Sequence, residues 1–291
     1  MAISKYCSIF AQKFKIMIKK IFHISDIHIP NSEDNRPYSK MVDGFLKDLV
    51  TQITQCGCKQ NEIRIVIVGD VFHQKIKASN EAKNTFHKML NILNALAKTI
   101  IVAGNHDMLE NNTDRMDSIT PTFEITGAYP NIVYIDKELN YKSGCIVDEN
   151  ITWTLFSMFD KFAKPVIPKK EDSNSKIIGL YHGNVAGAVT DLGRMTEDGI
   201  DTDEFEECDC VMAGHIHKFQ ELKKNGVPIV YPSSLFQQNA GENISMHGYV
   251  IWDLESMTYK FHEVPNDYKI YKFEITSYDD VNNDEERLLN L

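Results

Sequence analysis

The chain has 291 residues, enough for one large domain or for two smaller ones. Hydrophobic residues make up 43% of it, and no stretch reaches the roughly 20 apolar residues of a membrane span, so we expect a soluble protein with no membrane partner. The formal net charge of -10 disfavours broad attraction to polyanions. Any contact with nucleic acid would therefore depend on local basic patches or on metal ions.

The six cysteines form no zinc-type framework, which favours reduced thiols and an intracellular protein, cytoplasmic or nuclear. Residues 1–20 carry lysines but no acid, and we interpret them as an N-terminal extension. The apolar run that ends at Ile24 predicts the first strand, and Asp26 and His28 follow it. Residues two apart on a strand point the same way, so these two side chains could bind one metal ion together.

The next segments alternate between helix and strand patterns. Apolar residues recur at spacings of three and four over 38–54 and 80–97, which predicts two helices. β-Branched runs over 63–68 and 99–103 predict two buried strands. Such alternation is typical of crossover units, with helices on the faces of a sheet.

The second half of the chain has a different pattern. Residues 132–135 and 152–158 are predicted as strands of a second sheet, and 176–181 and 210–214 as further buried strands. Short strands separated by tight turns follow, over 219–222, 228–231, 247–253 and 258–264, with one more at Tyr271–Ile275. The whole sequence predicts an α/β fold, a two-sheet β-sandwich flanked by helices.

Five of the predicted strands end in residues that can bind metals: Asp26, His28, Asp70, Asn105, His106, His182, His215 and His217. Carboxylate, imidazole and carboxamide together suit manganese, iron or zinc better than calcium or magnesium. One ion cannot use so many ligands, whereas two ions about 3.5 to 4 Å apart can do so if a carboxylate bridges them. Asp70 is the natural bridge. His23, His87, His247 and His262 lie outside these positions, and we interpret them as core or surface histidines.

The order of these blocks resembles that of the calcineurin-like metallophosphoesterases. The blocks are Asp26-Ile27-His28, Gly69-Asp70, Gly104-Asn105-His106-Asp107, His182 and Gly214-His215-Ile216-His217. The resemblance implies a metallophosphoesterase domain over 21–264 with two divalent ions, manganese first, and iron, zinc and magnesium as alternatives. It assigns Asp26, His28, Asp70 and His217 to one ion, and Asp70, Asn105, His182 and His215 to the other. His106 would be the general acid, with Asp107 orienting its ring.

Two details are similar to the SbcD-type nuclease subunit of the double-strand-break repair complex. His73 stands three residues after Asp70, where the matching histidine helps to place the DNA phosphate, and we therefore include it among the catalytic residues. The stretch from Tyr231 to Glu242 resembles a motif of these nucleases, although Ser233 replaces their usual glycine. The resemblance predicts a DNA exonuclease and endonuclease of repair or recombination. It also implies an SbcC-type ATPase partner, a homodimer, and in 265–291 the start of a capping domain or a C-terminal tail.

Charged or aromatic residues in predicted loops are candidate DNA contacts: Arg36, Tyr38, Lys75, Lys77, Lys169, Lys170 and Arg194. Two alternatives remain open at this point. One is a phosphodiesterase or phosphatase that acts on small or protein phosphoesters, because the family shares its chemistry but not its substrates. The other is a catalytically inactive scaffold, which the complete set of ligand residues disfavours.

Overall fold

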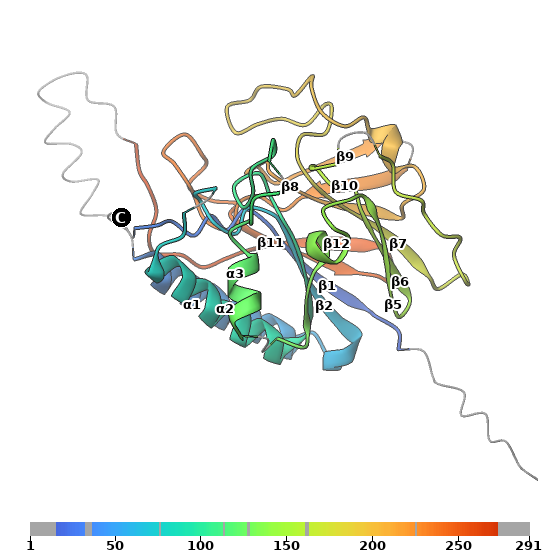
Figure 1. Ribbon diagram of the computed structural model, residues 1–291, viewed down its shortest axis with the longest axis horizontal. Coiled ribbons are helices and arrows are strands. Elements are labelled where there is room, and N and C mark those ends of the chain that lie inside the picture. Colours follow the sequence, from blue (N-terminus) through green and yellow to red (C-terminus); the bar gives the residue numbers. More distant parts are fainter. Residues whose placement is uncertain are drawn as a thin grey trace, which may run out of the picture.

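The computed structural model describes residues 16–32, 37–75, 77–112, 114–126, 129–160, 163–224 and 226–272. Two six-stranded sheets face each other in it (Figure 1). The first has the order β12-β11-β1-β2-β3-β4, and the second β5-β6-β7-β8-β10-β9. The strands of the first sheet are β1 (Lys20–Ile24), β2 (Ile63–Val68), β3 (Lys98–Val102), β4 (Ile132–Tyr134), β11 (Gly248–Asp253) and β12 (Thr258–Glu263). Those of the second are β5 (Gly144–Asp148), β6 (Ile151–Leu155), β7 (Lys176–His182), β8 (Cys210–Gly214), β9 (Gln220–Lys224) and β10 (Val227–Tyr231).

Two long helices, α1 (Tyr38–Gln55) and α2 (Asn80–Leu96), cover the outer face of the first sheet (Figure 1). Both begin and end within one residue of the ranges that the spacing of apolar residues predicts. Ser79 caps α2, because its hydroxyl accepts a hydrogen bond from the backbone N–H of Ala82 at 3.1 Å. Shorter helical segments are α3 (Thr120–Thr126), α4 (Ile135–Glu138), η1 (Gln60–Glu62) and η2 (Thr202–Phe205).

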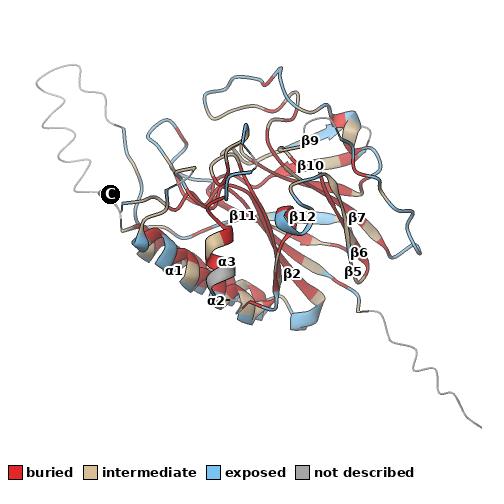
Figure 2. Ribbon diagram, viewed as in Figure 1, coloured by how far each residue is buried: buried red, intermediate tan, exposed pale blue. Residues whose placement is uncertain are grey.

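The central strands of the first sheet, β1, β2 and β3, are buried on both faces. In β2, Ile65 and Ile67 pack towards the helices, whereas Val66 and Val68 belong to the core between the two sheets. This arrangement explains why β2 is apolar without alternation, as expected of a parallel strand covered on both sides. Figure 2 shows the result as buried central strands and as helices that expose only their outer faces.

Parallel pairing directs the carboxyl ends of several strands to one edge of the sandwich. In the first sheet β1, β2 and β3 are parallel neighbours, and in the second β6, β7 and β8 are. The loops that follow β1, β2, β3 and β8, together with the last residue of β7, carry every residue predicted to bind metal. The fold therefore brings together side chains that are distant in the sequence.

Several predicted boundaries differ from the structure. Residues 132–135 were expected in the second sheet, but β4 pairs with β3 at the edge of the first. The expected boundary at residue 20 is late, because Ile18 is buried in the core between the sheets. Residues 271–272 form no strand, and the remainder of the strand expected at Tyr271–Ile275 lies outside the described residues.

Two expectations about the whole chain can be compared with the described part. Cys56, Cys58, Cys145, Cys208 and Cys210 are all free thiols, whereas Cys7 lies outside the described ranges. Among the described residues, no helix combines the length and the apolar character needed to cross a membrane. His23, interpreted from the sequence as a core or surface histidine, is fully buried and contacts the carbonyl of Ala213 at 3.1 Å.

Candidate metal centre

The predicted ligands meet at one edge of the sandwich in two adjoining groups. Asp26, His28 and His217 form one, Asp70, His182 and His215 the other, and within each group the ligand atoms lie within 4.8 Å of one another. The carboxylate of Asp70 faces both groups. Its Oδ2 lies 3.5 Å from Nε2 of His28, and its Oδ1 lies 3.3 Å from Nε2 of His182. A carboxylate in this position could bridge two ions, the role that the sequence predicts for Asp70.

Asn105 completes the second group. Its side-chain oxygen lies 2.9 Å from Nδ1 of His215 and 3.1 Å from Nε2 of His182. Oxygen and imidazole nitrogen atoms thus converge from four side chains, a donor set that suits a borderline divalent cation such as Mn²⁺ or Zn²⁺. The residues present therefore fit the metal that the sequence predicts.

Several of these residues hold an unusual backbone conformation. The φ angles of Asp26, His28 and Asp70 are 50°, 51° and 52°, and that of His215 is 102°. Residues other than glycine rarely adopt positive φ, and such strain collects at functional sites. Here it turns each side chain into the centre immediately after its strand ends.

Two glycines allow the backbone to approach the ligands closely. A Cβ atom at Gly69, where φ is 80°, would lie 2.0 Å from Nδ1 of His182, and one at Gly104 would lie 2.1 Å from Oδ1 of Asp70. Both distances are far below van der Waals contact. At Gly69 both the positive φ and the lack of room for a Cβ atom require glycine, whereas at Gly104 only the lack of room does.

Hydrogen bonds from outside the centre fix the orientation of two imidazoles. Nδ1 of His182 donates to the carbonyl of Val68 at 2.9 Å, and this leaves Nε2 as the nitrogen that faces Asp70. Nδ1 of His217 contacts Oε1 of Glu242 at 2.9 Å, and this leaves its Nε2 facing Asp26. Partners of this kind set the tautomer and the ring orientation of metal-bound histidines.

The buried carboxylates of the centre favour the binding of a cation. Burial raises the pKa of Asp26. Burial alone would lower the pKa of His182, but the neighbouring Asp70 and Asp26 carboxylates outweigh it and raise that pKa to about 10. The same pairing holds the pKa of Asp70 below its ordinary value despite burial. The protein without metal thus retains a proton on an imidazole beside two carboxylates, and a divalent ion can replace that positive charge.

The predicted catalytic residues have separate places. His106 and His73 lie beside His28, with ring centroids 4.8 and 5.4 Å from its ring, and His73 is exposed. Nδ1 of His106 lies 2.5 Å from the carbonyl of His73. The structure thus gives the ring of His106 a different orienting group from the expected Asp107, and that group is a backbone carbonyl.

Asp107 has another role in the structure. Its carboxylate is fully buried and accepts backbone N–H groups of Val71, Phe72 and Gly104 at 3.2, 2.9 and 3.0 Å. It therefore holds together the loops that follow β2 and β3 and carry Asp70 and Asn105. The sequence predicts a bond from Asp107 to the ring of His106, whereas these hydrogen bonds of Asp107 are to the backbone.

Comparison with known proteins identifies the family. A family model described as calcineurin-like phosphoesterase matches residues 19–219. The chain belongs to this family. It has the metallophosphoesterase fold.

Among curated relatives, the chain is 35% identical over 262 residues to an uncharacterized protein of Acanthamoeba polyphaga mimivirus. That match covers 87% of this chain but only 19% of the viral protein, so the chain spans about a fifth of its length. It is also 24% identical to a protein of Vesicomyosocius okutanii named "Probable cyclic nucleotide phosphodiesterase", with coverage of 82% of this chain and 96% of that protein.

Solved phosphoesterase structures are similar at lower identity. A novel archaeal phosphodiesterase is 12% identical with a TM-score of 0.42, over 84% of this chain and 99% of the other. A dimetal phosphatase from Danio rerio is 10% identical with a TM-score of 0.44, over 81% of this chain and 93% of the other. None of the relatives described here carries the name of an SbcD-type nuclease.

Sequence reasoning did not assign a role to Glu242. The residue belongs to the stretch from Tyr231 that resembles a nuclease motif, but its bond to His217 follows only from the fold. Glu242 is buried, and besides His217 it accepts hydrogen bonds from the side chain of Asn239 at 2.8 Å and the backbone of Gln238 at 2.8 Å. The signal available in the sequence was an acid placed 25 residues after a metal-binding histidine, which is too common to be specific.

The structure explains how a serine can occupy position 233 of the same stretch, where the motif usually has glycine. Its φ is 82°, a conformation that favours glycine. Its hydroxyl donates to the carbonyl of His217 at 2.8 Å. The position therefore requires a left-handed backbone, and the serine gains a hydrogen bond to the ligand-bearing segment.

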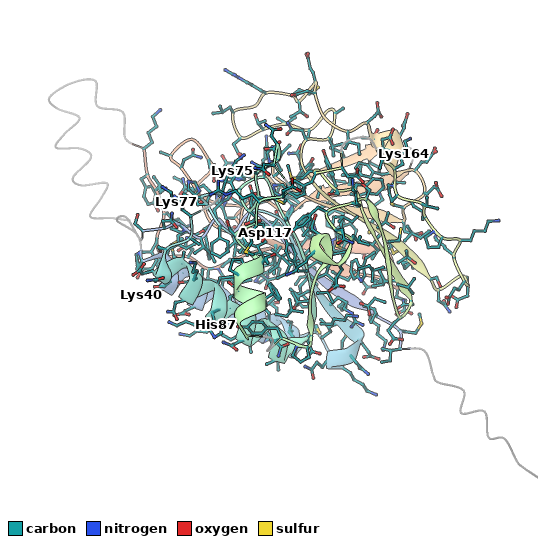
Figure 3. The ribbon with its side chains drawn as sticks, viewed as in Figure 1. Lys40, Lys75, Lys77, His87, Asp117 and Lys164 are labelled. Carbon is teal, nitrogen blue, oxygen red and sulfur yellow. The ribbon has the colours of Figure 1, made fainter. Side chains whose placement is uncertain are left out.

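The side chains predicted to contact DNA differ in their exposure and in their ion pairs. Tyr38 is buried and its hydroxyl donates to the carbonyl of Ile27, so its prediction as a surface contact is wrong. Lys75 pairs with Glu110 at 3.3 Å and Lys170 with Asp209 at 2.6 Å. Lys77, Lys169 and Arg194 are exposed, and Arg36 lies outside the described residues. Figure 3 shows Lys75 and Lys77 on one side of the molecule and Lys164 on the other.

Proposed function

We propose that the chain is a two-metal phosphodiesterase. The observation that carries this proposal is the position of Asp70, whose two carboxylate oxygens face two different groups of ligands, 3.5 Å from His28 and 3.3 Å from His182. Adjoining cation sites that share a carboxylate suit in-line displacement at phosphorus.

The residues of the chain have distinct tasks in this reaction. Divalent ions, when bound, supply an oxygen nucleophile at neutral pH and stabilise charge on the phosphoryl oxygens. Asp26, His28 and His217 would hold one ion, Asn105, His182 and His215 would hold the other, and Asp70 faces both groups. In its imidazolium form, His106 would keep its Nδ1–H on the carbonyl of His73 and donate its Nε2 proton to the leaving oxygen, which leaves the ring neutral.

For the substrate, we favour a small phosphodiester. The relative from Vesicomyosocius okutanii, whose name gives a cyclic nucleotide as its substrate, matches over 96% of its own length, so the whole of that protein corresponds to this chain. A chain of net charge -10 also gains no general attraction to a polyanion. A small substrate needs only the ions and the residues around them.

DNA is the second candidate substrate, and the position of His73 favours it. The residue is exposed and lies beside His28 and His106 at the open side of the centre, with its ring centroid 5.5 Å from that of His106. A cationic or donating imidazole there could contact a phosphate next to the one under attack. An SbcC-type ATPase partner and a homodimer remain predictions.

The experiment compares substrates directly. The purified chain is incubated with Mn²⁺ and bis(p-nitrophenyl) phosphate, 3′,5′-cyclic nucleotides, p-nitrophenyl phosphate or end-labelled duplex DNA. We expect hydrolysis of the diesters to exceed that of the monoester and to disappear in Asp70→Asn. Turnover of small diesters with intact DNA supports the first substrate, and degradation of DNA without turnover of cyclic nucleotides supports the second. Absence of all turnover with every divalent ion tested would refute the proposed activity.

A further inference from the structure

A cavity of about 200 Å³ adjoins the candidate metal centre on the side of His217. Asp191, His217, Phe219, Asn243, Ser245 and Met246 are among the residues that line it. Sites that enclose a whole drug-sized ligand measure roughly 300 to 1,000 Å³, so this cavity has room for one part of a substrate. Because His217 is shared with the centre, that part would be attached to the phosphorus under attack.

The wall formed by residues 243–247 is held in place from behind. Nε2 of His247 contacts the carbonyl of Asn243 at 2.7 Å, and Nδ1 contacts the hydroxyl of Ser234 at 3.0 Å. Met246, between these anchors, has φ of 68°, a strained value for a residue with a long side chain. The imidazole of His247 is buried, so this histidine closes the loop and ties it to the segment beside His217.

The opposite wall is anchored equally well. The side chain of Gln220 accepts the N–H of Val189 at 2.8 Å and donates to the carbonyl of Val189 at 2.8 Å. This two-point bond fixes the loop that carries Asp191 to the start of β9. The ring of Phe219 is held by Phe261, at a centroid distance of 4.6 Å. The cavity is therefore formed before any ligand binds.

The cavity lining combines apolar and polar side chains, and this combination suits a flat heterocycle. Phe219 and Met246 provide apolar contact, and aromatic faces bind planar rings by stacking. No hydrogen bond within the described residues engages the side chains of Asn243 and Ser245, which leaves an amide and a hydroxyl for a ligand. A carboxylate oxygen of Asp191 lies within 4.8 Å of ligand atoms of His217 and Glu242. Lys218 also lines the cavity, so its charge is mixed, and the carboxylate of Asp191 offers an acceptor to a group with N–H donors.

Exposed apolar residues stand next to the lining residues in the chain. Leu192 is 73% exposed, and Ile244 and Met246 are each 41% exposed. The loops that carry them meet, since a Cβ atom on Gly241 would lie 3.9 Å from Cδ2 of Leu192. Exposed apolar side chains close together are typical of ligand-binding surfaces.

We propose that this cavity binds the nucleobase of a nucleotidyl phosphodiester, with Phe219 and Met246 against the ring and Asp191 accepting its N–H groups. The inference rests on the proposed function, because it assigns the substrate of that centre to the nucleotides. It applies to a cyclic nucleotide and to DNA alike, and it makes the loops 189–192 and 243–247 the determinants of specificity.

Nucleosides test the cavity separately from catalysis, since they have no phosphate for the metal centre. Binding of cytidine and of ribose to the full chain is measured by titration calorimetry and by saturation-transfer NMR, with chelator present. We expect cytidine to bind and ribose not to bind. Ser245→Phe, which fills the cavity from an exposed loop, should weaken cytidine binding at least tenfold, and Asp191→Asn at least threefold. Ser173→Phe is the matched control on an exposed loop before β7 and should bind as the unaltered chain does.

Kinetics provide the second readout. With thymidine 5′-(p-nitrophenyl phosphate) and Mn²⁺, Ser245→Phe should raise KM at least fivefold with a smaller change in kcat. If cytidine binds no better than ribose, or if Ser245→Phe and Ser173→Phe behave alike, the cavity is not a base site, whatever the activity on bis(p-nitrophenyl) phosphate. If cytidine binds as expected but no diester is hydrolysed, the proposed function fails and the binding site stands.

Discussion

The Nε2 atoms of His28 and His217 lie 3.0 Å apart. Oδ1 of Asp26 is 3.8 Å from the first of these nitrogens and 3.6 Å from the second. Because Nδ1 of His217 is engaged by Glu242, its Nε2 is the nitrogen that faces the other imidazole. Two such nitrogens repel each other unless a proton or a cation lies between them, and a divalent cation would satisfy both together with the carboxylate.

Metal binding should therefore stabilise the fold. A ligand that binds only the folded state adds about 2.7 kcal/mol to the free energy of unfolding at a concentration 100 times its Kd. For a chain of this size that corresponds to a rise in Tm of roughly 4 °C. Differential scanning fluorimetry with Mn²⁺, Zn²⁺ or Mg²⁺, followed by chelator, measures the shift. Unchanged Tm with all three ions would contradict the assignment of the centre.

Replacement of His106 should separate catalysis from metal binding. His106→Ala removes the proposed general acid and should lower kcat roughly 10²- to 10⁴-fold. The metal content of the variant should equal that of the unaltered chain, because neither of the two ligand groups around Asp70 includes His106. Atomic emission spectroscopy and hydrolysis of bis(p-nitrophenyl) phosphate provide the two measurements.

His87→Ala is the control for this experiment. His87 lies on α2, away from the centre, where its Nδ1 contacts the hydroxyl of Tyr129 at 2.5 Å (Figure 3). This variant should retain its kcat. Equal losses of activity in both histidine variants, or loss of metal in His106→Ala, would argue against the role of His106 as an acid.

Glu242 should act through His217. Burial alone would lower the pKa of His217, but the bond to Glu242 outweighs it and, with Asp26, raises that pKa to about 9. Glu242→Gln removes the charge that strengthens this imidazole as a ligand, and loss of such a partner typically weakens metal affinity about 10- to 100-fold. Competition with a fluorescent chelator measures the change in affinity. Glu255→Gln, an exposed position on the turn between β11 and β12, should have no effect.

Much of this centre could be predicted because its ligands stand at strand ends. The runs before Asp70, Asn105 and His215 are apolar on both faces, so they had to be buried strands, and parallel strands direct their carboxyl ends to one edge. The helices were equally clear, since α1 and α2 each have one apolar face and one polar face. Local patterns therefore specified both the elements and the clustering of polar residues between them.

The parts that the sequence did not predict depend on contacts between distant segments. The sequence of the short strand β4 does not indicate which sheet it joins, and packing decides its pairing with β3. The partners of Asp107 are backbone amides, which look the same at every position in a sequence. Tyr38 begins a helix after a polar loop, and only the fold shows that its ring turns inward to the carbonyl of Ile27.

A buried ion-pair cluster should make stability depend on acid pH. Asp148 accepts two hydrogen bonds from Arg64, at 2.6 and 2.9 Å, and one from Lys98 at 2.9 Å. Burial alone would raise the pKa of Asp148, but these two cations lower it from 3.8 to about 2. Because the folded-state pKa is the lower one, the stabilisation is complete above about pH 4 and is lost as the pH falls through 2. It amounts to something on the order of 2 kcal/mol.

Asp148→Asn provides the measurement of this effect. At pH 7 the variant should be less stable than the unaltered chain by about 3 to 5 kcal/mol, because it leaves the buried Arg64 without its counter-charge. The difference between the two proteins in urea unfolding should shrink between pH 4 and pH 2. A constant difference over that range would show that the charge of Asp148 does not contribute to stability.

Gly104 should be indispensable for function although it has an ordinary backbone conformation. In Gly104→Ala the new Cβ would lie 2.1 Å from Oδ1 of Asp70, so the bridging carboxylate must move. We expect metal content and kcat to fall at least tenfold. Gly44→Ala is the matched control, because nothing lies within 4 Å of a Cβ atom at that position of α1. It should raise the free energy of unfolding by about 1 kcal/mol through helix propensity and leave kcat unchanged. Urea unfolding and hydrolysis of bis(p-nitrophenyl) phosphate are measured for both variants. The comparison separates the space that the ligands require from the general effect of adding a methyl group. A fully active Gly104→Ala would show that Asp70 does not need its observed position.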